Sequence, residues 1–450
     1  SICLIANTAP VAWGAIGIPI VVGGQVAGIP DLALSQMVGR TLPFLSFLVP
    51  LYLVILMAGW KKGPEVWPAC LVSGGSFAIA QYFSANSPLT APLLPDLIAS
   101  ISSIVCTVAF LKFWHPKESW HFADEPKREG KAKLLYTGGQ IFRAWAPFII
   151  LSLFVCAWGI KPVNQALDQI TKTVFNFAFP IAGLDQMVID QAGKAKAAVY
   201  KFNVLSAAGT AILFAWFFSI VVMGASLKTA GGVARDTLVT LKWPIVTIAT
   251  ILGFAYIMNF SGMAITLGYA VATTGVAFPF FAALLGWLGV FMTGSDTSTN
   301  ALFGKLQAVT AEKIGIDPVI TMSANTCGGV CGKMISPQSI SVATGATGMV
   351  GRESEIFRFT FKHSIGMAVV VGGMHMLWAY VFPGMVPTYV KPVAAAAAAA
   401  AGVVQAAINP VGLMWLGIFV AIITCVTFLA RRLGADLEAP AAGHDEVHFH

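Results

Sequence analysis

Charged residues are scarce in this chain of 450 residues, where Asp, Glu, Lys and Arg together make up 10%. Hydrophobic residues make up 57%, and the mean hydropathy is +0.78. This composition excludes a soluble globular domain, in which about a quarter of the residues are charged. The net charge of +7 lies between apolar runs, so it indicates membrane topology and not a nucleic-acid-binding surface. The sequence predicts an all-α polytopic membrane protein.

Cysteine is also sparse, and the seven Cys residues are dispersed mostly in apolar segments. This pattern indicates no disulfide framework. Cys327 and Cys331 are four positions apart in a Gly-rich stretch, but no His lies nearby, and a structural zinc ion needs four such ligands. We therefore expect no metal and no cofactor, and we interpret both cysteines as small packing residues.

The motifs of membrane-embedded enzymes are absent as well. The sequence has no His-Glu-x-x-His metal motif, no Gly-x-Ser-x-Gly elbow and no evident pair of aspartates within membrane segments. An enzyme is therefore a distant alternative, and we expect no catalytic residue.

Long apolar runs dominate what is present, and many are long enough to cross a bilayer. The clearest windows are 41–59, 95–114, 143–160, 203–226, 243–260, 269–292, 361–382 and 411–430, and two weaker ones are 66–83 and 393–410. We expect one transmembrane domain over 1–430, with about nine to eleven membrane segments. A polar tail follows at 431–450.

The distribution of Lys and Arg predicts the topology. Seven of them lie between positions 112 and 143, and none lies between 84 and 95. By the positive-inside rule, the loop 115–142 is cytoplasmic and the segment 84–95 is external. The mixed, Pro- and Gly-punctuated stretch 161–201 is expected to be an external amphipathic excursion. Because the sequence opens on Ser1 within a hydrophobic element, it is also expected to be N-terminally truncated.

A fourteen-residue pattern occurs twice, 318 positions apart, and both copies lie in apolar sequence. The matching residues are Ala6-Asn7-Thr8, Gly14 and Pro19 in the first copy, and Ala324-Asn325-Thr326, Gly332 and Pro337 in the second. Hydrophobic segments interrupted by Gly and Pro at corresponding positions of two halves are the best sequence pointer to a transporter binding site. Irregular backbone at membrane depth is tolerated only around a cavity or inside packed protein.

The helices that follow the two copies are expected to run in opposite directions. Lys61 and Lys62 follow the window 41–59, whereas Arg352 and Arg358 precede the window 361–382. This asymmetry predicts an inverted-repeat secondary transporter with broken or re-entrant helices.

The strongest local signal for a site is the polar stretch from Gly294 to Asn300, directly after a very apolar run. Its hydroxyl and amide groups are typical of a helix N-terminus, which attracts anions. An ordinary extramembrane turn is the alternative. The candidate substrate-binding residues are Ser295, Thr297, Ser298 and Asn300 here, Asn7 and Thr8 in the first copy, and Asn325, Thr326, Gly328, Gly329 and Lys333 in the second.

Asp296 is the outstanding single residue of this stretch. A carboxylate at membrane depth is costly and is a functional candidate by default. We consider two roles for Asp296, which are proton coupling and an ionised N-cap that holds the turn together. Lys333 would neutralise a small carboxylate or pair with Asp296, and a snorkelling lysine near a helix end is the competing reading.

Several segments together resemble the L-lactate permease family of bacteria, over nearly the whole chain from Ser1 to about Pro387. They are Asn7–Ala12, Gly74–Tyr82, Gly286–Gly304 and Gly332–Ser339. The resemblance implies a multi-pass secondary transporter of the bacterial inner membrane that imports lactate, and often glycolate, with protons. The implied partners are these small molecules, protons and the lipid bilayer, with no nucleic acid. This sequence departs from the family by lacking its N-terminal helices and by extending beyond Pro387.

Two further readings stay open from the residues alone. A sodium-coupled transporter, or one for other organic anions, would use the same hydroxyl groups and freed carbonyls. A channel fits less well, because broken repeats suit alternating access better than a continuous pore. The oligomeric state is left open.

Overall fold

The computed structural model describes residues 1–8, 10–14, 17–116, 137–175, 178–189, 195–201, 204–347, 349 and 351–390. Over these residues the chain is mostly helical, as the sequence predicts. The expected spans at 393–410 and 411–430, the tail 431–450 and most of the loop 115–142 lie outside the described residues.

The first quarter of the chain places short helices before long apolar ones. Its elements are α1 (Ile2–Ala6), η1 (Val11–Trp13), α2 (Ile18–Ala27), α3 (Asp31–Val38), α4 (Leu42–Lys62), η2 (Gly63–Val66), α5 (Trp67–Asn86) and α6 (Pro95–Leu111). The three long helices α4, α5 and α6 confirm the helices expected at 41–59, 66–83 and 95–114 and pack in sequence order.

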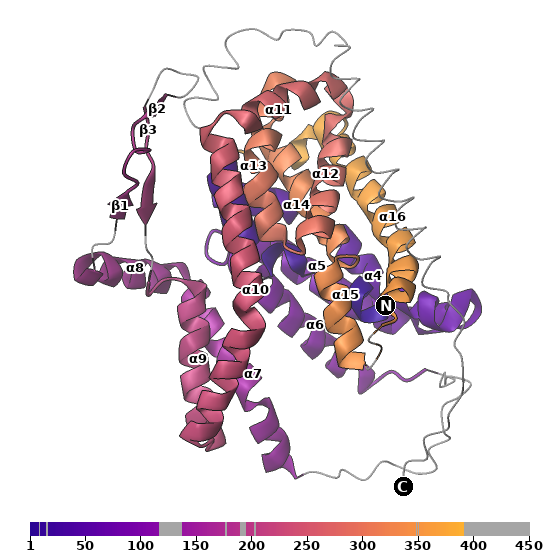
Figure 1. Cartoon of the computed structure of the whole chain (residues 1–450). Coiled ribbons are helices and arrows are strands. Elements are labelled where there is room, and N and C mark those ends of the chain that lie inside the picture. Colours follow the sequence, from indigo (N-terminus) through magenta and orange to yellow (C-terminus); the bar gives the residue numbers. More distant parts are fainter. Residues whose placement is uncertain are drawn as a thin grey trace, which may run out of the picture.

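The middle of the chain forms helices on one side of the molecule (Figure 1). They are α7 (Gly138–Gly159), α8 (Lys161–Phe175), α9 (Ala208–Met223) and α10 (Leu227–Phe260). A capping box starts α7, because Gln140 N donates to Thr137 Oγ1 at 3.3 Å and Thr137 N donates to Gln140 Oε1 at 2.9 Å. Helices α7 and α9 pack against each other and lie where apolar segments are expected at 143–160 and 203–226.

The stretch 161–201 corrects the expectation of an all-α protein. After α8 it contains β1 (Ala178–Pro180), β2 (Val188–Ile189), β3 (Ala195–Lys196) and β4 (Val199–Lys201). Strand β1 pairs antiparallel with β4, and β2 with β3. Strands of two or three residues are too short to produce a recognisable alternation in sequence, so the pattern did not predict them.

The last described part contains the centre of the molecule. Its elements are α11 (Met263–Val271), η3 (Ala272–Ala277), α12 (Phe278–Thr293), α13 (Asp296–Lys313), α14 (Pro318–Lys333), α15 (Pro337–Thr347), α16 (Glu353–Tyr380) and η4 (Pro383–Met385). Helices α12, α13 and α14 lie together, with α16 beside them (Figure 1). We expected one continuous helix over the window 269–292. A 3₁₀ segment with Gly275 at φ 59° interrupts it instead.

Helices α4 and α16 are antiparallel where they meet. Trp378 Nε1 in α16 donates to Thr41 Oγ1 at the start of α4, at 3.2 Å. The hydroxyl of Tyr52, further along α4, bonds to Nδ1 of His363, nearer the start of α16. The numbering therefore rises along α4 while it falls along α16. The two helices run in opposite directions, as their flanking charges predict.

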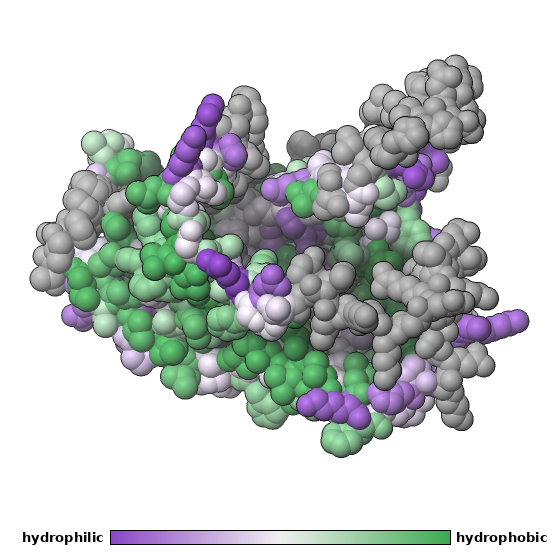
Figure 2. All heavy atoms as spheres, turned by 90° about the horizontal axis from the view of Figure 1, so that it is seen from below, coloured by the Kyte–Doolittle hydropathy of each residue, from purple (hydrophilic) through white to green (hydrophobic). Residues whose placement is uncertain are grey.

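The outer surface is strongly apolar. Many large side chains stay exposed, including Phe113 at 88%, Val221 at 78% and Phe83 at 68%. Figure 2 shows hydrophobic residues over much of the described surface, with hydrophilic side chains projecting mainly near its edges. Within the described part of the chain, three helical stretches are long and apolar enough to cross a membrane, namely Asp31–Asn86, Gly138–Gly159 and Thr266–Thr293. An apolar surface of this extent indicates contact with lipid.

Candidate functional site

The polar stretch after α12 forms the helix break that the sequence predicts. Gly294 ends α12 in the left-handed conformation, with φ 68°, and Ser295 is the N-cap of α13. The hydroxyl of Ser295 accepts a hydrogen bond from Ser298 N at 3.2 Å. Thr293 Oγ1 lies 3.1 Å from Thr299 Oγ1 and closes the turn. Asp296 therefore occupies the first turn of α13.

The two copies of the repeated pattern break at different places. In the first copy, α1 ends at Ala6 and α2 starts at Ile18 with Pro19 in its first turn. In the second copy, α14 continues to Lys333, and α15 starts at Pro337. Both prolines thus lie at helix starts, where a missing backbone donor costs little.

Gly328 and Gly329 lie inside a regular helix, where neither has a positive φ angle. The glycines of α14 instead allow close approach of a neighbouring backbone. A Cβ atom on Gly328 would collide with the backbone of Ala283, and one on Gly332 would collide with that of Trp287. The absence of side chains lets α14 and α12 touch backbone to backbone, which fixes the position of the helix break relative to α14.

A fully buried set of side chains, here called the amide cluster, joins α13 to α14. Its members are Asn300, Gln307, Thr321, Asn325 and Thr326, all with 0% exposure. Asn325 Nδ2 donates to Asn300 Oδ1 at 2.9 Å, and Thr326 Oγ1 donates to the same oxygen at 3.2 Å. Gln307 Nε2 donates to Asn325 Oδ1 at 3.0 Å, and Thr321 Oγ1 donates to the Gln307 carbonyl at 3.0 Å.

The amide cluster also reaches the first copy of the repeat. Asn300 Nδ2 donates to the carbonyl of Pro19 at 3.0 Å, across 281 positions of sequence. A buried amide left without partners costs about 1–3 kcal/mol, so this connected network orients its members strongly. Asn300 therefore links the two repeat copies at the centre of the fold.

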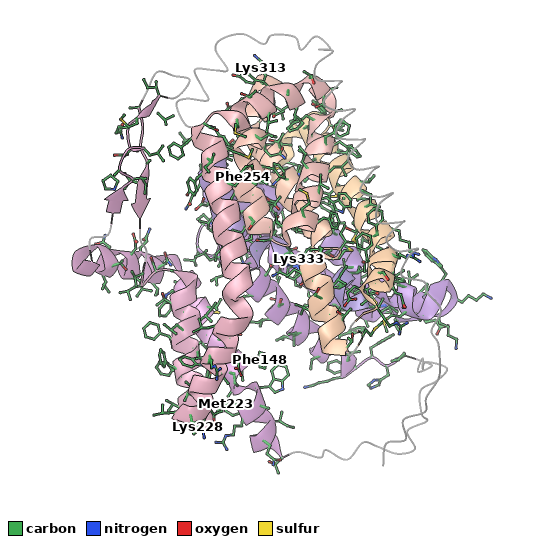
Figure 3. The ribbon with its side chains drawn as sticks, viewed as in Figure 1. Phe148, Met223, Lys228, Phe254, Lys313 and Lys333 are labelled. Carbon is green, nitrogen blue, oxygen red and sulfur yellow. The ribbon has the colours of Figure 1, made fainter. Side chains whose placement is uncertain are left out.

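Asp296 and Lys333 lie beside this cluster. Asp296 is 4% exposed, and within the described residues neither carboxyl oxygen has a hydrogen-bond partner. The Lys333 ammonium donates to the carbonyl of Gly294, at the end of α12, and is close enough for its charge to act on Asp296. Gly329 faces Asp296, because a Cβ atom there would meet Oδ1. In Figure 3, Lys333 lies at mid-height of the bundle, between Lys313 at one end and Lys228 at the other.

The remaining candidates are placed as follows. Ser298 is buried, and Thr297 is half-buried in the first turn of α13. Asn7 is exposed at the end of α1, and Thr8 is buried with its hydroxyl donated to the Ile5 carbonyl at 2.7 Å. No hydrogen bond of the described residues joins Asn7 or Thr8 to the amide cluster. The first copy reaches the cluster through Pro19 instead.

Sequence reasoning missed three polar residues with structural roles here, namely Gln307 and Thr321 of the amide cluster and Asp96 of α6. Gln307 belongs to the amide cluster, and only its spacing of seven residues from Asn300, which places both on one face of a helix, could have indicated this. Asp96 lies in the first turn of α6 and contacts η1 of the first repeat copy. Its position after Pro95 resembles an ordinary helix start, so no sequence signal distinguished it.

Comparisons with known proteins agree with this architecture. The model of the L-lactate permease family matches residues 1–382. The chain is 49% identical to the glycolate permease GlcA of Escherichia coli K12, over 85% of this chain and 71% of that protein. It is 48% identical to the L-lactate permease of Bacillus subtilis, over 86% and 72%. It is 34% identical to that of Halalkalibacterium halodurans, over 84% and 69%.

No solved structure matches the chain. The family match covers most of the chain, and each of these relatives is matched over more than two thirds of its own length. The buried polar centre and the apolar outer surface are those of a membrane permease. The chain therefore belongs to the L-lactate permease family and is a transporter, not an enzyme.

Proposed function

We propose that this chain imports L-lactate and related short 2-hydroxy monocarboxylates such as glycolate, together with protons, across a bacterial inner membrane. The observation that carries the proposal is the buried amide cluster beside Asp296 and Lys333, inside a protein with an apolar outer surface. The names of the relatives, lactate and glycolate permeases, support this class of substrate.

The substrate has one carboxylate and one neighbouring hydroxyl group, and the helix break offers partners for both. The start of α13 carries hydroxyl groups of Ser295, Thr297 and Ser298, and a helix N-terminus favours an anion. Lys333 supplies the positive charge, and Asn300, Asn325 and the neighbouring Thr326 supply amide and hydroxyl groups. Rearrangement of the cluster during transport would expose these groups, which in the present conformation bond to one another.

Asp296 is the proposed proton carrier. Moving a monocarboxylate anion together with one proton is nearly electroneutral, so a single titrating group is enough. An almost completely buried carboxyl group with no hydrogen-bond partner among the described residues is expensive while ionised, which favours uptake of a proton. Lys333 acts in the opposite sense, because its charge stabilises the ionised carboxylate. Binding of an anionic substrate to Lys333 would remove that stabilisation and favour proton uptake by Asp296. Substrate binding and proton binding would thereby be coupled.

The proposed architecture is a pair of inverted repeats in one transport domain. The antiparallel course of α4 and α16, the helices that follow the two repeat copies, supports the inversion. Asn300 bonds to Pro19 of the first copy and accepts from Asn325 of the second, as expected for a site between two repeats. Movement of one repeat against the other would then open the site to alternate sides.

Uptake of labelled L-lactate by cells that express the protein tests this function. We expect saturable uptake that collapses when a protonophore removes the proton gradient and that does not depend on sodium. Uptake that requires sodium and survives the protonophore would replace proton coupling by sodium coupling. A well-inserted protein that takes up no lactate or glycolate would refute the substrate assignment.

A further inference from the structure

A second carboxyl group with an incomplete set of partners lies in the first half of the chain. Asp96, in the first turn of α6, is partly exposed as a residue, but its Oδ2 atom is shielded from solvent and has no hydrogen-bond partner among the described residues. No cation of the described part of the chain pairs with it. The buried His375 is better satisfied, because it bonds to Ser323 Oγ and to the Val371 carbonyl.

A directed chain of polar groups leads to Asp96. Ser46 Oγ of α4 donates to Gln81 Oε1 of α5 at 2.9 Å, and Gln81 Nε2 donates to Asp96 Oδ1 at 3.2 Å. The backbone N–H of Trp13 in η1 also lies close to the carboxyl group. Gln81 of α5 and the Trp13 N–H of η1 thus lie against Asp96, Ser46 of α4 reaches it through Gln81, and none of these groups carries a charge. They leave Oδ2 as the site for a proton.

Asp96 and Asp296 hold comparable places relative to the two repeat copies. Asp296 faces Gly329 in the second copy, and Asp96 lies close to the backbone N–H of Trp13 in the first. Trp13 corresponds to Cys331 in the repeat, two positions from Gly329. Each broken segment thus has one carboxyl group against nearly the same part of the pattern.

We propose that Asp96 is a second proton-carrying residue of the transport cycle, acting in the first half of the chain as Asp296 acts in the second. This inference rests on the proposed proton-coupled transport. Protonation of Asp96 removes a charge that has no cationic partner, and deprotonation restores a negative charge that attracts the nearby Trp13 N–H. The state of the proton on Asp96 therefore changes how firmly η1 is held against α6.

The decisive variant is Asp96→Asn, which keeps an oxygen that can accept from Gln81 but cannot carry a proton. In proteoliposomes with an imposed pH gradient, we expect net L-lactate uptake to fall by more than about tenfold. Exchange of labelled for unlabelled lactate across the same membrane, which needs no net proton movement, is expected to stay within about twofold of the unmodified protein. Glu65→Gln, which neutralises an exposed carboxylate of the same half, is the matched control and leaves both rates unchanged.

Two results would overturn the role of Asp96. Net uptake by Asp96→Asn at the unmodified rate and pH dependence would show that its proton is not used. Loss of exchange together with net uptake, in a protein whose melting temperature is unchanged, would assign Asp96 to anchoring η1 only. If the unmodified protein itself shows lactate uptake without a proton requirement, the proposed function fails first, and the two failures are thereby distinguished.

Discussion

At the scale of single residues, the balance between Asp296 and Lys333 carries the proposed coupling. The carboxyl group is buried without hydrogen-bond partners among the described residues, and the ammonium group is satisfied by the Gly294 carbonyl. Of the two roles considered for Asp296 from the sequence, the structure excludes that of the N-cap. The N-cap of α13 is Ser295, so Asp296 does not hold the turn together as a cap.

Replacement of Asp296 by Asn tests proton coupling. The amide cannot titrate, so we expect net proton-driven lactate uptake to fall by more than about tenfold, with exchange of labelled for unlabelled lactate preserved. Both rates are measured in proteoliposomes. Glu355→Gln, at an exposed carboxylate that pairs with Arg352 at 2.6 Å, is the control and leaves both rates unchanged. An unaltered dependence of net uptake on pH in Asp296→Asn would contradict the assignment.

Replacement of Lys333 by Gln separates substrate binding from helix capping. We expect the KM for lactate to rise about tenfold, because about 1.4 kcal/mol of charge attraction is lost. The free energy of unfolding should fall by only about 1 kcal/mol, since one hydrogen bond to the end of α12 is weakened. Lys313→Gln, at an exposed lysine of the preceding helix, serves as the control for loss of charge alone. An unchanged KM with reduced stability would leave Lys333 with the capping role only.

Residue-level prediction from sequence succeeded where the local pattern determines the structure. A run of Ser, Thr and Asn directly after an apolar helix leaves few alternatives to a new helix start, and Ser295 is indeed that start. Prediction from sequence did not identify Asp96, because the groups beside Asp96, Gln81 and Trp13, come from other elements. The bond from Asn300 to Pro19 spans 281 positions and was equally out of reach.

At the scale of elements, the contact between α12 and α14 determines the shape of the site. Gly328 and Gly332 of α14 lie against the backbone of Ala283 and Trp287 in α12. Sequence alone predicted a break at Gly332 as well as at Pro337, because it cannot distinguish a glycine required for packing from one required for an unusual dihedral angle. The helix continues through Gly332 to Lys333, and the next one starts at Pro337.

A methyl group at Gly328 should force the two helices apart. We expect Gly328→Ala to lower the free energy of unfolding by about 1–3 kcal/mol and to impair transport, because the new Cβ would collide with the backbone of α12. Thermal unfolding in detergent measures the effect. Gly373→Ala in α16 is the matched control, since a Cβ there meets nothing within 4 Å, and alanine favours the helix. Equal stability of the two variants would contradict the close packing.

At the scale of the whole molecule, an apolar exterior surrounds a polar centre that joins the two repeat copies. The expected loop 115–142 on the cytoplasmic side and the neutral connection between α5 and α6 on the external side give this arrangement a direction in the membrane. Composition and charge predicted the class of protein well, since they depend only on the sum of the residues. They could not predict the two short β-pairs after α8, where local strands carry almost no pattern.

The direction of insertion can be read by labelling. In a variant without its native cysteines, we expect Leu89→Cys, at a side chain that is 61% exposed, to react with a membrane-impermeant maleimide added to intact cells. Lys131→Cys, in the loop 115–142, should react only after the membrane is opened. Reversed labelling of the two sites would invert the proposed topology and the direction assigned to α4 and α16.

The central claim is that lactate and protons cross together, and proton movement itself tests it most directly. In lightly buffered proteoliposomes that contain the protein and start without a pH gradient, addition of L-lactate outside should alkalinise the external medium as protons enter with the substrate. The account predicts that Asp296→Asn abolishes this signal while lactate exchange continues. Lactate entry with no accompanying proton movement, in the absence of sodium, would contradict it.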